Sequence, residues 1–438
     1  MFLPAGVLHY FSMKYIVPVF LILSLAGCYR SDAYLDPLVA IQIQDRNGLT
    51  ETINAPDRLA VYNETDFLSS QPYKKILRVY KKSGKSHSII TTYHSNGNVW
   101  QYLEVQELRA HGPYREWHSN GQLKIEAKVI GGTADVAPGT QRDWLFDELS
   151  QVWNEQGHLI ATIPYRHGVL EGKSLYYYPS GQIEKELPFT QNVLNGEAVE
   201  HFDNGKLKSK VFYIQGTKEG ISLGFFENGQ VRAIEEFTEG LLLKGAYYDV
   251  HGEKLAEVED GMGFQAVFEG DFLTYLVQIF QGAAEGGVKL YASNGELLGL
   301  YHIKNGTKHG EEISYFLAAE KEAKGVDSLP KLSVQWDRDT IHGKVKTWYN
   351  NGQLQSQRDY SRNKKNGSSL SWYRDGTLML LEEYEEGHLV KGQYYKKNGR
   401  DPVSTIFNGS GTASLYDENG IFLKKVVYAK GDPVDPEN

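Results

Sequence analysis

The chain has 438 residues, of which 41% are hydrophobic and 23% are charged, a composition that favours a folded protein over a disordered one. Its net charge is −9 and no block of basic residues stands out, which argues against non-specific binding to nucleic acid. A single cysteine excludes an internal disulfide and any cysteine-based zinc cluster. The 29 tyrosines, 18 phenylalanines and 45 glycines favour β-structure with many tight turns.

Residues 1–27 are predicted to be a signal peptide. Lys14 is followed by an apolar run that is too short to span a bilayer comfortably. The run ends in Leu25, Ala26, Gly27 and Cys28, and this tetrapeptide resembles the bacterial lipobox. The resemblance implies cleavage before the cysteine and lipid attachment to it. An ordinary secretory signal with an incidental cysteine is the alternative.

The lipobox resemblance also implies a location in a bacterial envelope. Tyr29, rather than an aspartate, follows the cysteine, and by resemblance to the usual sorting pattern this favours the outer membrane. Met13 is a more natural start than Met1, because residues 1–12 carry no charge ahead of the apolar run. Residues 28–79 are expected to form an N-terminal β cap or linker.

A repeat of about 24 residues organises residues 80–428. In each unit an aromatic residue lies four positions before a glycine. The positions that we take as structural anchors of the repeat are Tyr93, Gly97, Trp117, Gly121, Trp153, Gly157, Tyr177, Gly181, Gly205, Phe225, Gly229, Trp348, Gly352, Trp372 and Gly376. Two longer intervals contain insertions, at residues 131–142 and 317–333. Stacked units are expected to bury their anchor rings against their neighbours.

Each unit is predicted to be a β-hairpin. Most anchor glycines follow an asparagine, as at Asn96 and Asn351, and this dipeptide predicts a type I′ turn. After the glycine, apolar and polar residues alternate, which is typical of a strand with one buried face. A further aromatic often stands eight residues past the glycine, as at Tyr360 and Tyr384, and another glycine, such as Gly367, opens the next unit.

The pattern predicts an all-β fold, an elongated array of antiparallel hairpins that forms an open meander or solenoid. Residues 314–324 could form a short helix on its surface. The tail at residues 429–438 is rich in turn residues and is expected to fray.

Several segments, such as residues 196–207 and 348–354, resemble the variant MORN repeat (membrane occupation and recognition nexus). The resemblance covers roughly residues 80–428. Bacterial proteins with this variant are often labelled as the antitoxin component of a toxin–antitoxin system, so the resemblance implies binding of a partner protein.

Few residues suggest catalysis. Ser222 stands in a G-x-S-x-G pattern, but it falls at the start of a repeat strand rather than at a strand–elbow–helix, so we interpret it as structural. The 13 histidines show no paired metal-ligand spacing, and no phosphate-binding loop or dinucleotide fingerprint is present, so neither a metal nor a cofactor is expected. The acidic residues at 235–239 and 382–386 are interpreted as solvated strand faces, with a hydrolytic carboxylate pair as the alternative.

Three functions are compatible with the sequence. The first is a non-catalytic, lipid-anchored scaffold that binds an unknown partner protein through its extended sheet. The second is an antitoxin-like inhibitor, and the third is a hydrolase with its site in the insertions. The aromatic ladders are read as core packing, with an open groove for a peptide, glycan or lipid chain as the alternative.

Overall fold

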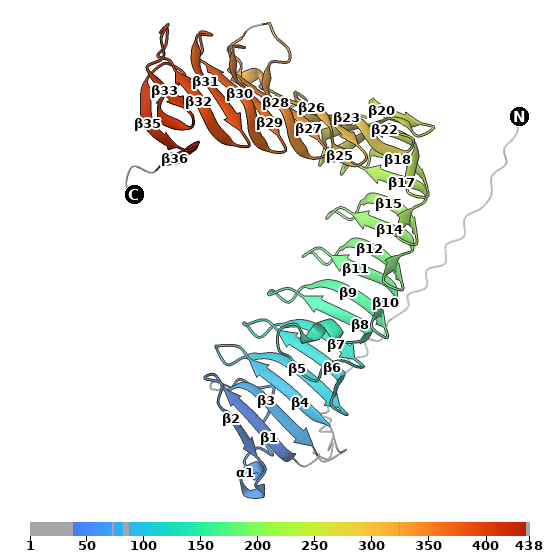
Figure 1. Cartoon of the computed structure of the whole chain (residues 1–438). Helices are drawn as coiled ribbons and strands as arrows, with labels where there is room; N and C mark the ends of the chain where they lie inside the picture. Colours follow the sequence, from blue (N-terminus) through green and yellow to red (C-terminus); the bar gives the residue numbers. More distant parts are fainter. Residues whose placement is uncertain (1–37, 72–73, 82–86, 324, 435–438) are drawn as a thin grey trace, which may run out of the picture.

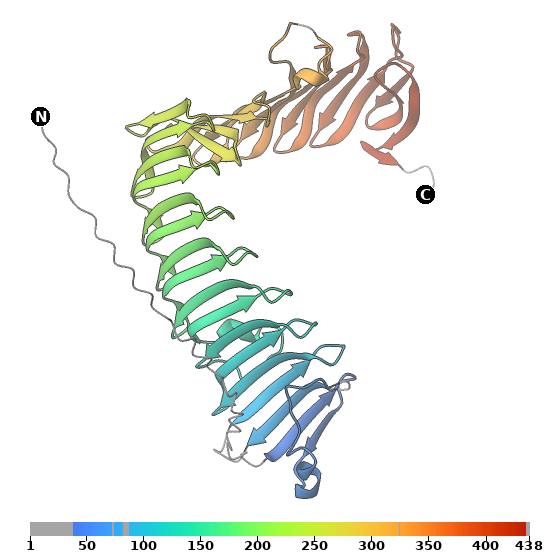
Figure 2. The same ribbon diagram turned by 180° about the vertical axis from the view of Figure 1, so that it is seen from behind.

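The structure, a computed structural model, describes residues 38–71, 74–81, 87–323 and 325–434. In these residues the chain forms one long, open, antiparallel sheet of 36 strands (Figure 1). The predicted all-β hairpin array is therefore confirmed. The strands stack side by side along a long axis, and this axis turns near β18 to β25, so that the two arms of the array point in different directions (Figures 1 and 2).

Consecutive strands pair with each other along almost the whole sheet. The strands of the first arm are β1 (Leu38–Asp45), β2 (Thr50–Ile53), β3 (Lys74–Lys81), β4 (Ser88–Tyr93), β5 (Val99–Gln106), β6 (Arg109–Trp117), β7 (Leu123–Val129), β8 (Phe146–Trp153), β9 (Leu159–Arg166), β10 (Val169–Leu170), β11 (Gly172–Tyr177), β12 (Ile183–Thr190), β13 (Val193–Leu194), β14 (Gly196–His201), β15 (Leu207–Ile214), β16 (Thr217–Lys218) and β17 (Gly220–Phe225).

The remaining strands form the bend and the second arm. They are β18 (Val231–Thr238), β19 (Leu241–Tyr248), β20 (Lys254–Glu259), β21 (Met262–Glu269), β22 (Phe272–Phe280), β23 (Ala283–Tyr291), β24 (Leu297–Lys304), β25 (Thr307–Lys308), β26 (Gly310–Tyr315), β27 (Pro330–Asp337), β28 (Thr340–Trp348), β29 (Leu354–Ser361), β30 (Lys364–Trp372), β31 (Leu378–Glu385), β32 (His388–Tyr394), β33 (Ser404–Phe407), β34 (Ser410–Tyr416), β35 (Phe422–Ala429) and β36 (Asp432–Val434).

At the N-terminal end, β1 lies between β2 and β3. The short helix α1 (Pro56–Ala60) follows β2 and buries Leu59 against Ile41 and Ile53. This end of the sheet therefore has its own small core.

The two faces of the sheet differ in chemistry because side chains alternate along each strand. We call apolar face the one that carries Leu103, Tyr114 and Val129, all of which are buried. We call charged face the opposite one, where cross-strand ion pairs such as Arg115–Glu126 at 2.7 Å are typical. Buried clusters lie near both ends of the sheet and at the bend.

The prediction of type I′ turns at the Asn–Gly dipeptides is wrong. At these turns only the glycine has a positive φ, which is 93° at Gly97, and the Gly97 N–H donates to the carbonyl of His94 at 2.9 Å. This is a type I turn followed by a left-handed glycine. Paired positive φ angles occur at the opposite hairpin ends instead, for example 48° and 61° at Glu107 and Leu108.

The asparagines of these turns have a different role. The Asn351 side-chain amide donates to the carbonyl of Arg374, at the turn of the next unit, at 3.1 Å. Its carbonyl oxygen accepts the backbone N–H of Gln353 at 3.0 Å. Asn120 makes the equivalent pair of bonds to Glu155 and Gln122. Asparagine therefore recurs because it ties neighbouring turns together.

The two insertions are loops at strand ends. The first contains a 3-10 helix (Thr140–Asp143) and buries Trp144 edge-on against Tyr114, with ring centres 4.9 Å apart. The second has a 3-10 turn only at Ala318–Glu320, because Ser314 and Tyr315 still belong to β26. A helix over residues 314–324 is thus not formed in the part of this segment that the structure describes.

Candidate functional site

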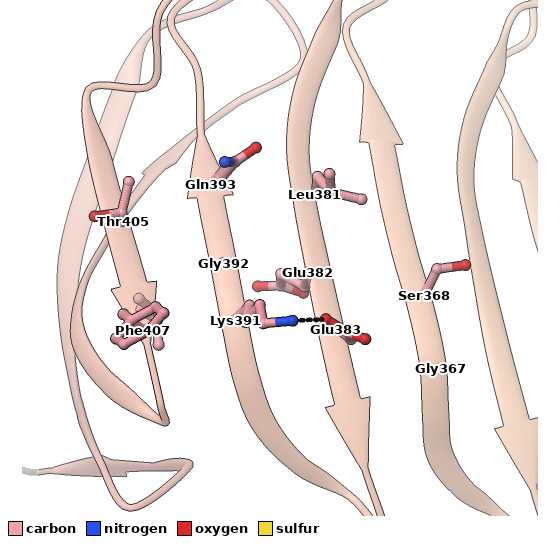
Figure 3. A pocket seen from close by; sticks show the side chains of 11 residues that line it. Gly367, Ser368, Leu381, Glu382, Glu383, Lys391, Gly392, Gln393, Thr405 and Phe407 are labelled. Carbon is pink, nitrogen blue, oxygen red and sulfur yellow. Dashed lines mark hydrogen bonds and ion pairs between the residues drawn. The ribbon is translucent and has the colours of Figure 1, made fainter.

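A hollow of about 490 Å³ lies on the charged face of β30 to β33 (Figure 3). The register places Ser368 opposite Glu383, Leu381 opposite Gln393, and Gln393 opposite Thr405, so these side chains share one face. Gly367 and Gly392 contribute only backbone to its lining. The hollow therefore has a backbone floor and side-chain walls.

The walls combine apolar side chains with one ion pair. Phe407 is 69% exposed and Leu381 is 37% exposed, although both are large and apolar. The Lys391 ammonium donates to a Glu383 carboxylate oxygen at 2.9 Å, and this hydrogen bond raises the pKa of Lys391. The arrangement suits an apolar side chain of a partner whose flanking groups are polar.

Glu382, on the opposite face behind the hollow, is buried in a hydrogen-bonded cluster. Its carboxylate accepts the hydroxyls of Tyr394 at 2.8 Å, of Tyr384 at 3.2 Å and of Ser369 at 3.4 Å. Burial, with the nearby Glu382 carboxylate as a second cause, raises the pKa of both tyrosines. The Lys365 ammonium lies 4.3 Å from the centre of the Tyr384 ring, and burial lowers its pKa.

The same arrangement occurs at the bend. Glu235 lies opposite Gly245, as Glu382 lies opposite Gly392. Tyr247, two residues after Gly245, donates its hydroxyl to Glu235 at 2.8 Å. A Cβ atom on Gly245 would lie 2.7 Å from that hydroxyl oxygen, so the tyrosine passes directly over the glycine. Only glycine leaves room for this contact.

The interpretation of the acidic stretches as solvated strand faces is therefore wrong for Glu382 and only partly right for Glu235, which is half-buried. Glu382 is only 8% exposed, whereas its neighbour Glu383 is on the charged face. Strand alternation separates the two carboxylates onto opposite faces, so they do not form a catalytic pair. The glycine-x-tyrosine sequence at 245–247 and 392–394 is the signal that could have revealed that Glu235 and Glu382 accept tyrosine hydroxyls.

The anchor residues lie at the ends and turns of the hairpins. All eight anchor glycines have positive φ angles, between 78° at Gly205 and 93° at Gly97 and Gly229. Of the anchor rings, Tyr93 is buried, and the others are only partly buried, namely Trp117, Trp153, Tyr177, Phe225, Trp348 and Trp372. The residue after the anchor is the more buried one in several units, with Tyr373 at 0% and Phe226 at 1% exposure.

Ser222 lies in the middle of β17 and is 3% exposed. Its hydroxyl is buried and has no hydrogen-bond partner among the described residues. A nucleophilic serine needs a base within hydrogen-bond reach. The His94 and His118 rings instead contact the backbone carbonyls of Trp117 and Trp153, both at 2.9 Å.

No group of three metal-ligating side chains is found in the described residues. No helix of the described part of the chain is long and apolar enough to cross a membrane. Cys28 and the lipobox residues Leu25, Ala26 and Gly27 lie outside the described residues.

Five hairpins match the family model described as "MORN repeat variant". The matched segments are residues 110–129, 170–191, 194–215, 218–239 and 341–361. MORN repeat variants recur along the chain. Each matched segment covers one strand, its Asn–Gly or equivalent turn, and the next strand of a MORN unit.

No protein of curated function matches the chain. The solved structures that match the chain have low TM-scores. A Tc holotoxin pore of Photorhabdus luminescens is 11% identical, with 90% of this chain and 24% of that chain covered and a TM-score of 0.14. The TcdB2-TccC3-Cdc42 complex is 12% identical, with 85% and 23% covered and a TM-score of 0.12. A porin-like protein from Bacteroides uniformis is 10% identical, with 62% and 94% covered and a TM-score of 0.15.

The chain thus spans about a quarter of the length of the toxin chains that it matches, 24% and 23%. At these TM-scores the likenesses carry no argument about this protein.

Proposed function

We propose that this protein is a non-catalytic, lipid-anchored scaffold of a bacterial envelope that binds a partner protein through the hollow on β30 to β33. The observation that carries the proposal is the exposure of Phe407 and Leu381 around a 490 Å³ hollow. Exposed apolar groups framed by polar ones are typical of protein-binding surfaces.

The surroundings of the hollow support this proposal. Elsewhere on the charged face, cross-strand ion pairs such as Lys173–Glu186 at 2.8 Å and Lys344–Asp359 at 2.9 Å link neighbouring strands. In the hollow, the Lys391–Glu383 pair leaves Phe407 uncovered on the neighbouring strand. The Glu382 cluster on the other face ties β30, β31 and β32 together, which gives the hollow a rigid floor.

The non-catalytic part of the proposal is supported by the environment of Ser222, whose hydroxyl points into a packed sheet face. The lipid anchor rests on the tetrapeptide that ends in Cys28. If Cys28 carries the lipid, the wild-type protein partitions into the detergent phase and Cys28→Ser moves it to the aqueous phase or leaves it unprocessed. Wild-type protein in the aqueous phase would contradict the anchor.

The binding site is tested with a photo-crosslinking residue placed at Gln393, in the wall of the hollow, in intact envelopes. We expect a discrete crosslinked product that disappears with Phe407→Asp. Phe280→Asp is the matched control, because Phe280 is also exposed, at 48%, but lies at the bend. A crosslinked product that persists with Phe407→Asp, or that is lost equally with Phe280→Asp, would contradict the site.

A further inference from the structure

A second hollow, of about 670 Å³, lies at the turn ends of β26 to β29. Its lining includes Leu332 of β27 and Thr347 of β28, which are paired in register. Thr347 also lies opposite Ser356, which shares a face of the sheet with Glu382. The second hollow is therefore on the opposite face from the hollow on β30 to β33, and the two are separate sites.

The second insertion forms one wall of this hollow, and hydrogen bonds hold it in place. The Asn350 side-chain amide donates to the carbonyl of Glu320 at 2.9 Å, and the Asn350 carbonyl accepts the N–H of Glu322 at 3.0 Å. At the base of the insertion, the N–H of Phe316 donates to the carbonyl of Leu329 at 2.9 Å. The insertion is thus fastened to the sheet, and the hollow is a preformed site.

The charged groups of the lining are paired with each other. The Lys331 ammonium lies 3.3 Å from the Glu320 carboxylate, and the Arg374 guanidinium lies 3.4 Å from the Glu418 carboxylate. Glu322, beside the lining, pairs with Arg374 at 2.5 Å. An anionic ligand would meet three carboxylates here, and a cationic ligand would meet the two basic groups. The lining therefore favours a neutral ligand.

Aromatic surface lies beside these polar groups. The Lys331 ammonium lies 5.2 Å from the centre of the Phe316 ring. The Trp348 ring also lines the hollow and is partly exposed, and it makes no hydrogen bond or ring contact with another described residue. The amide of Gln355 lies in the same lining. Trp348 is therefore the ring on which a ligand can stack, with hydrogen-bonding groups around it.

We propose that this hollow binds a neutral saccharide. The apolar C–H groups on the face of a sugar ring pack on Trp348. Each sugar hydroxyl both donates and accepts, so the hydroxyls donate to Glu320 and Glu418 and accept from Lys331 and Arg374.

An apolar side chain of a partner protein fits this hollow less well than a sugar does. It would take the ion pairs of the lining out of water without replacing their hydrogen bonds. The volume of 670 Å³ lies within the range of about 300–1,000 Å³ that is usual for small-molecule sites. The proposal does not depend on the partner site on β30 to β33.

The test uses the full chain with fluorotryptophan in place of its seven tryptophans, followed by fluorine NMR. The Trp348 resonance is identified by its absence in Trp348→Phe. The probes are maltotriose, cellotriose and triacetylchitotriose, which are neutral sugars with different linkages and substituents. We expect at least one of them to shift the Trp348 resonance in a saturable manner. Added salt should leave its affinity unchanged, and the anionic sugar trigalacturonate should bind at least about tenfold more weakly.

Two variants remove contacts to the sugar, and calorimetry measures the affinity that remains. Trp348→Ala should lower the affinity at least about tenfold, and Gln355→Ala should lower it about two- to tenfold, as expected for one neutral hydrogen bond. Trp153→Ala is the control for the first variant, because Trp153 is a partly buried anchor in the first arm. Gln357→Ala is the control for the second, because Gln357 lies opposite Lys346 on the charged face. Both controls should bind as the wild type does.

No saturable shift of the Trp348 resonance with any of the three sugars would overturn the proposal. Sugar affinity that Gln355→Ala and Trp348→Ala leave unchanged would place the sugar elsewhere and would also overturn it. If Trp348→Ala does not fold, as judged by circular dichroism, the wild-type shift and Gln355→Ala decide. Tighter binding of trigalacturonate would contradict a neutral ligand. A shift caused by a tripeptide with a central phenylalanine, but by none of the sugars, would assign the hollow to a partner protein.

Discussion

The hydroxyl of Tyr349 donates a hydrogen bond of 2.9 Å to the backbone carbonyl of Trp372, the anchor of the next repeat unit. Tyr373 makes the same bond to Tyr395 at 2.7 Å, and Tyr178 makes it to His201 at 2.9 Å. The residue that follows an anchor thus donates to the carbonyl of the residue four positions before the glycine of the next turn. Side-chain ties of this kind couple successive hairpins in addition to the strand ladder.

The variant Tyr349→Phe tests this tie. It keeps the ring and removes the hydrogen bond, so the free energy of unfolding should fall by about 0.5–1.5 kcal/mol. The measurement is urea unfolding of the second arm, followed by tyrosine fluorescence. Tyr395→Phe is the matched control, because the single hydrogen bond of the Tyr395 hydroxyl among the described residues goes to the exposed Gln393 side chain, and the effect of this variant should be smaller.

Tyr373→Ala should lower the free energy of unfolding more than Trp372→Ala does. Tyr373 is 0% exposed, so Tyr373→Ala should lower the free energy of unfolding by about 3–5 kcal/mol. Trp372→Ala should lower it by less, because the Trp372 ring is only partly buried. Hydrogen exchange of residues 345–400 should show the larger loss of protection in Tyr373→Ala. An equal or larger loss in Trp372→Ala would show that the anchor ring is the principal packing residue.

The stability of the second arm should fall in alkaline solution. Burial, followed by the nearby Tyr416 and Asp417, raises the pKa of Tyr373 from 10.0 to about 12. A raised pKa means that the folded state holds the phenolic proton more tightly, so this stabilisation is complete below pH 10 and is lost between pH 10 and 12. The stability difference between wild type and Tyr373→Phe should shrink over this interval, and a constant difference would contradict the assignment.

Leu108 is an unfavourable residue for its turn. Its φ is 61° in the two-residue turn between β5 and β6, and its side chain is 78% exposed. Leu108→Gly should therefore raise the free energy of unfolding by about 0.5–1 kcal/mol, because glycine adopts positive φ without a steric cost. Thermal unfolding measures the change, and Leu49→Gly, at an exposed leucine whose φ is not positive, should give no gain.

Ser222 and Ser369 occupy equivalent positions, opposite Glu235 and Glu382. The Ser369 hydroxyl donates to Glu382 at 3.4 Å, whereas the buried Ser222 hydroxyl has no partner among the described residues. Ser222→Ala should be neutral or stabilising by up to about 1 kcal/mol, and Ser369→Ala should be mildly destabilising. Stoichiometric labelling of Ser222 by a fluorophosphonate probe would instead indicate a hydrolase.

The sequence predicted the repeat, its hairpins and its two faces, because glycine spacing and strand alternation are local signals. It did not predict which ring of each unit is buried. In many hairpins the pairing register of the two strands shifts by one residue at a bulge next to the anchor, as between Ser371 and Trp372. The pairing partner of the anchor ring therefore differs from the one that regular alternation predicts. A bulge depends on both strands, so counting along one strand cannot locate it.

The candidate site was harder to predict than the fold. Phe407 reads as an ordinary strand residue, and its exposure depends on the short β33 and on the neighbouring strands. The burial of Glu382 requires a tyrosine that crosses a glycine on the next strand. Both features come from pairs of strands, and a single sequence does not show how such pairs are aligned.

The side-chain hydrogen bonds from each unit to the next have a consequence for the length of the array. These hydrogen bonds join neighbouring units. If a whole unit such as residues 182–205 were removed, the turns on either side of it would therefore make the equivalent hydrogen bonds to each other. Each unit adds two strands, or about 9.5 Å along the stack. Repeat number would then act as a ruler that sets how far the C-terminal arm stands from the N-terminal end, and duplication or loss of one unit would change that reach in fixed steps.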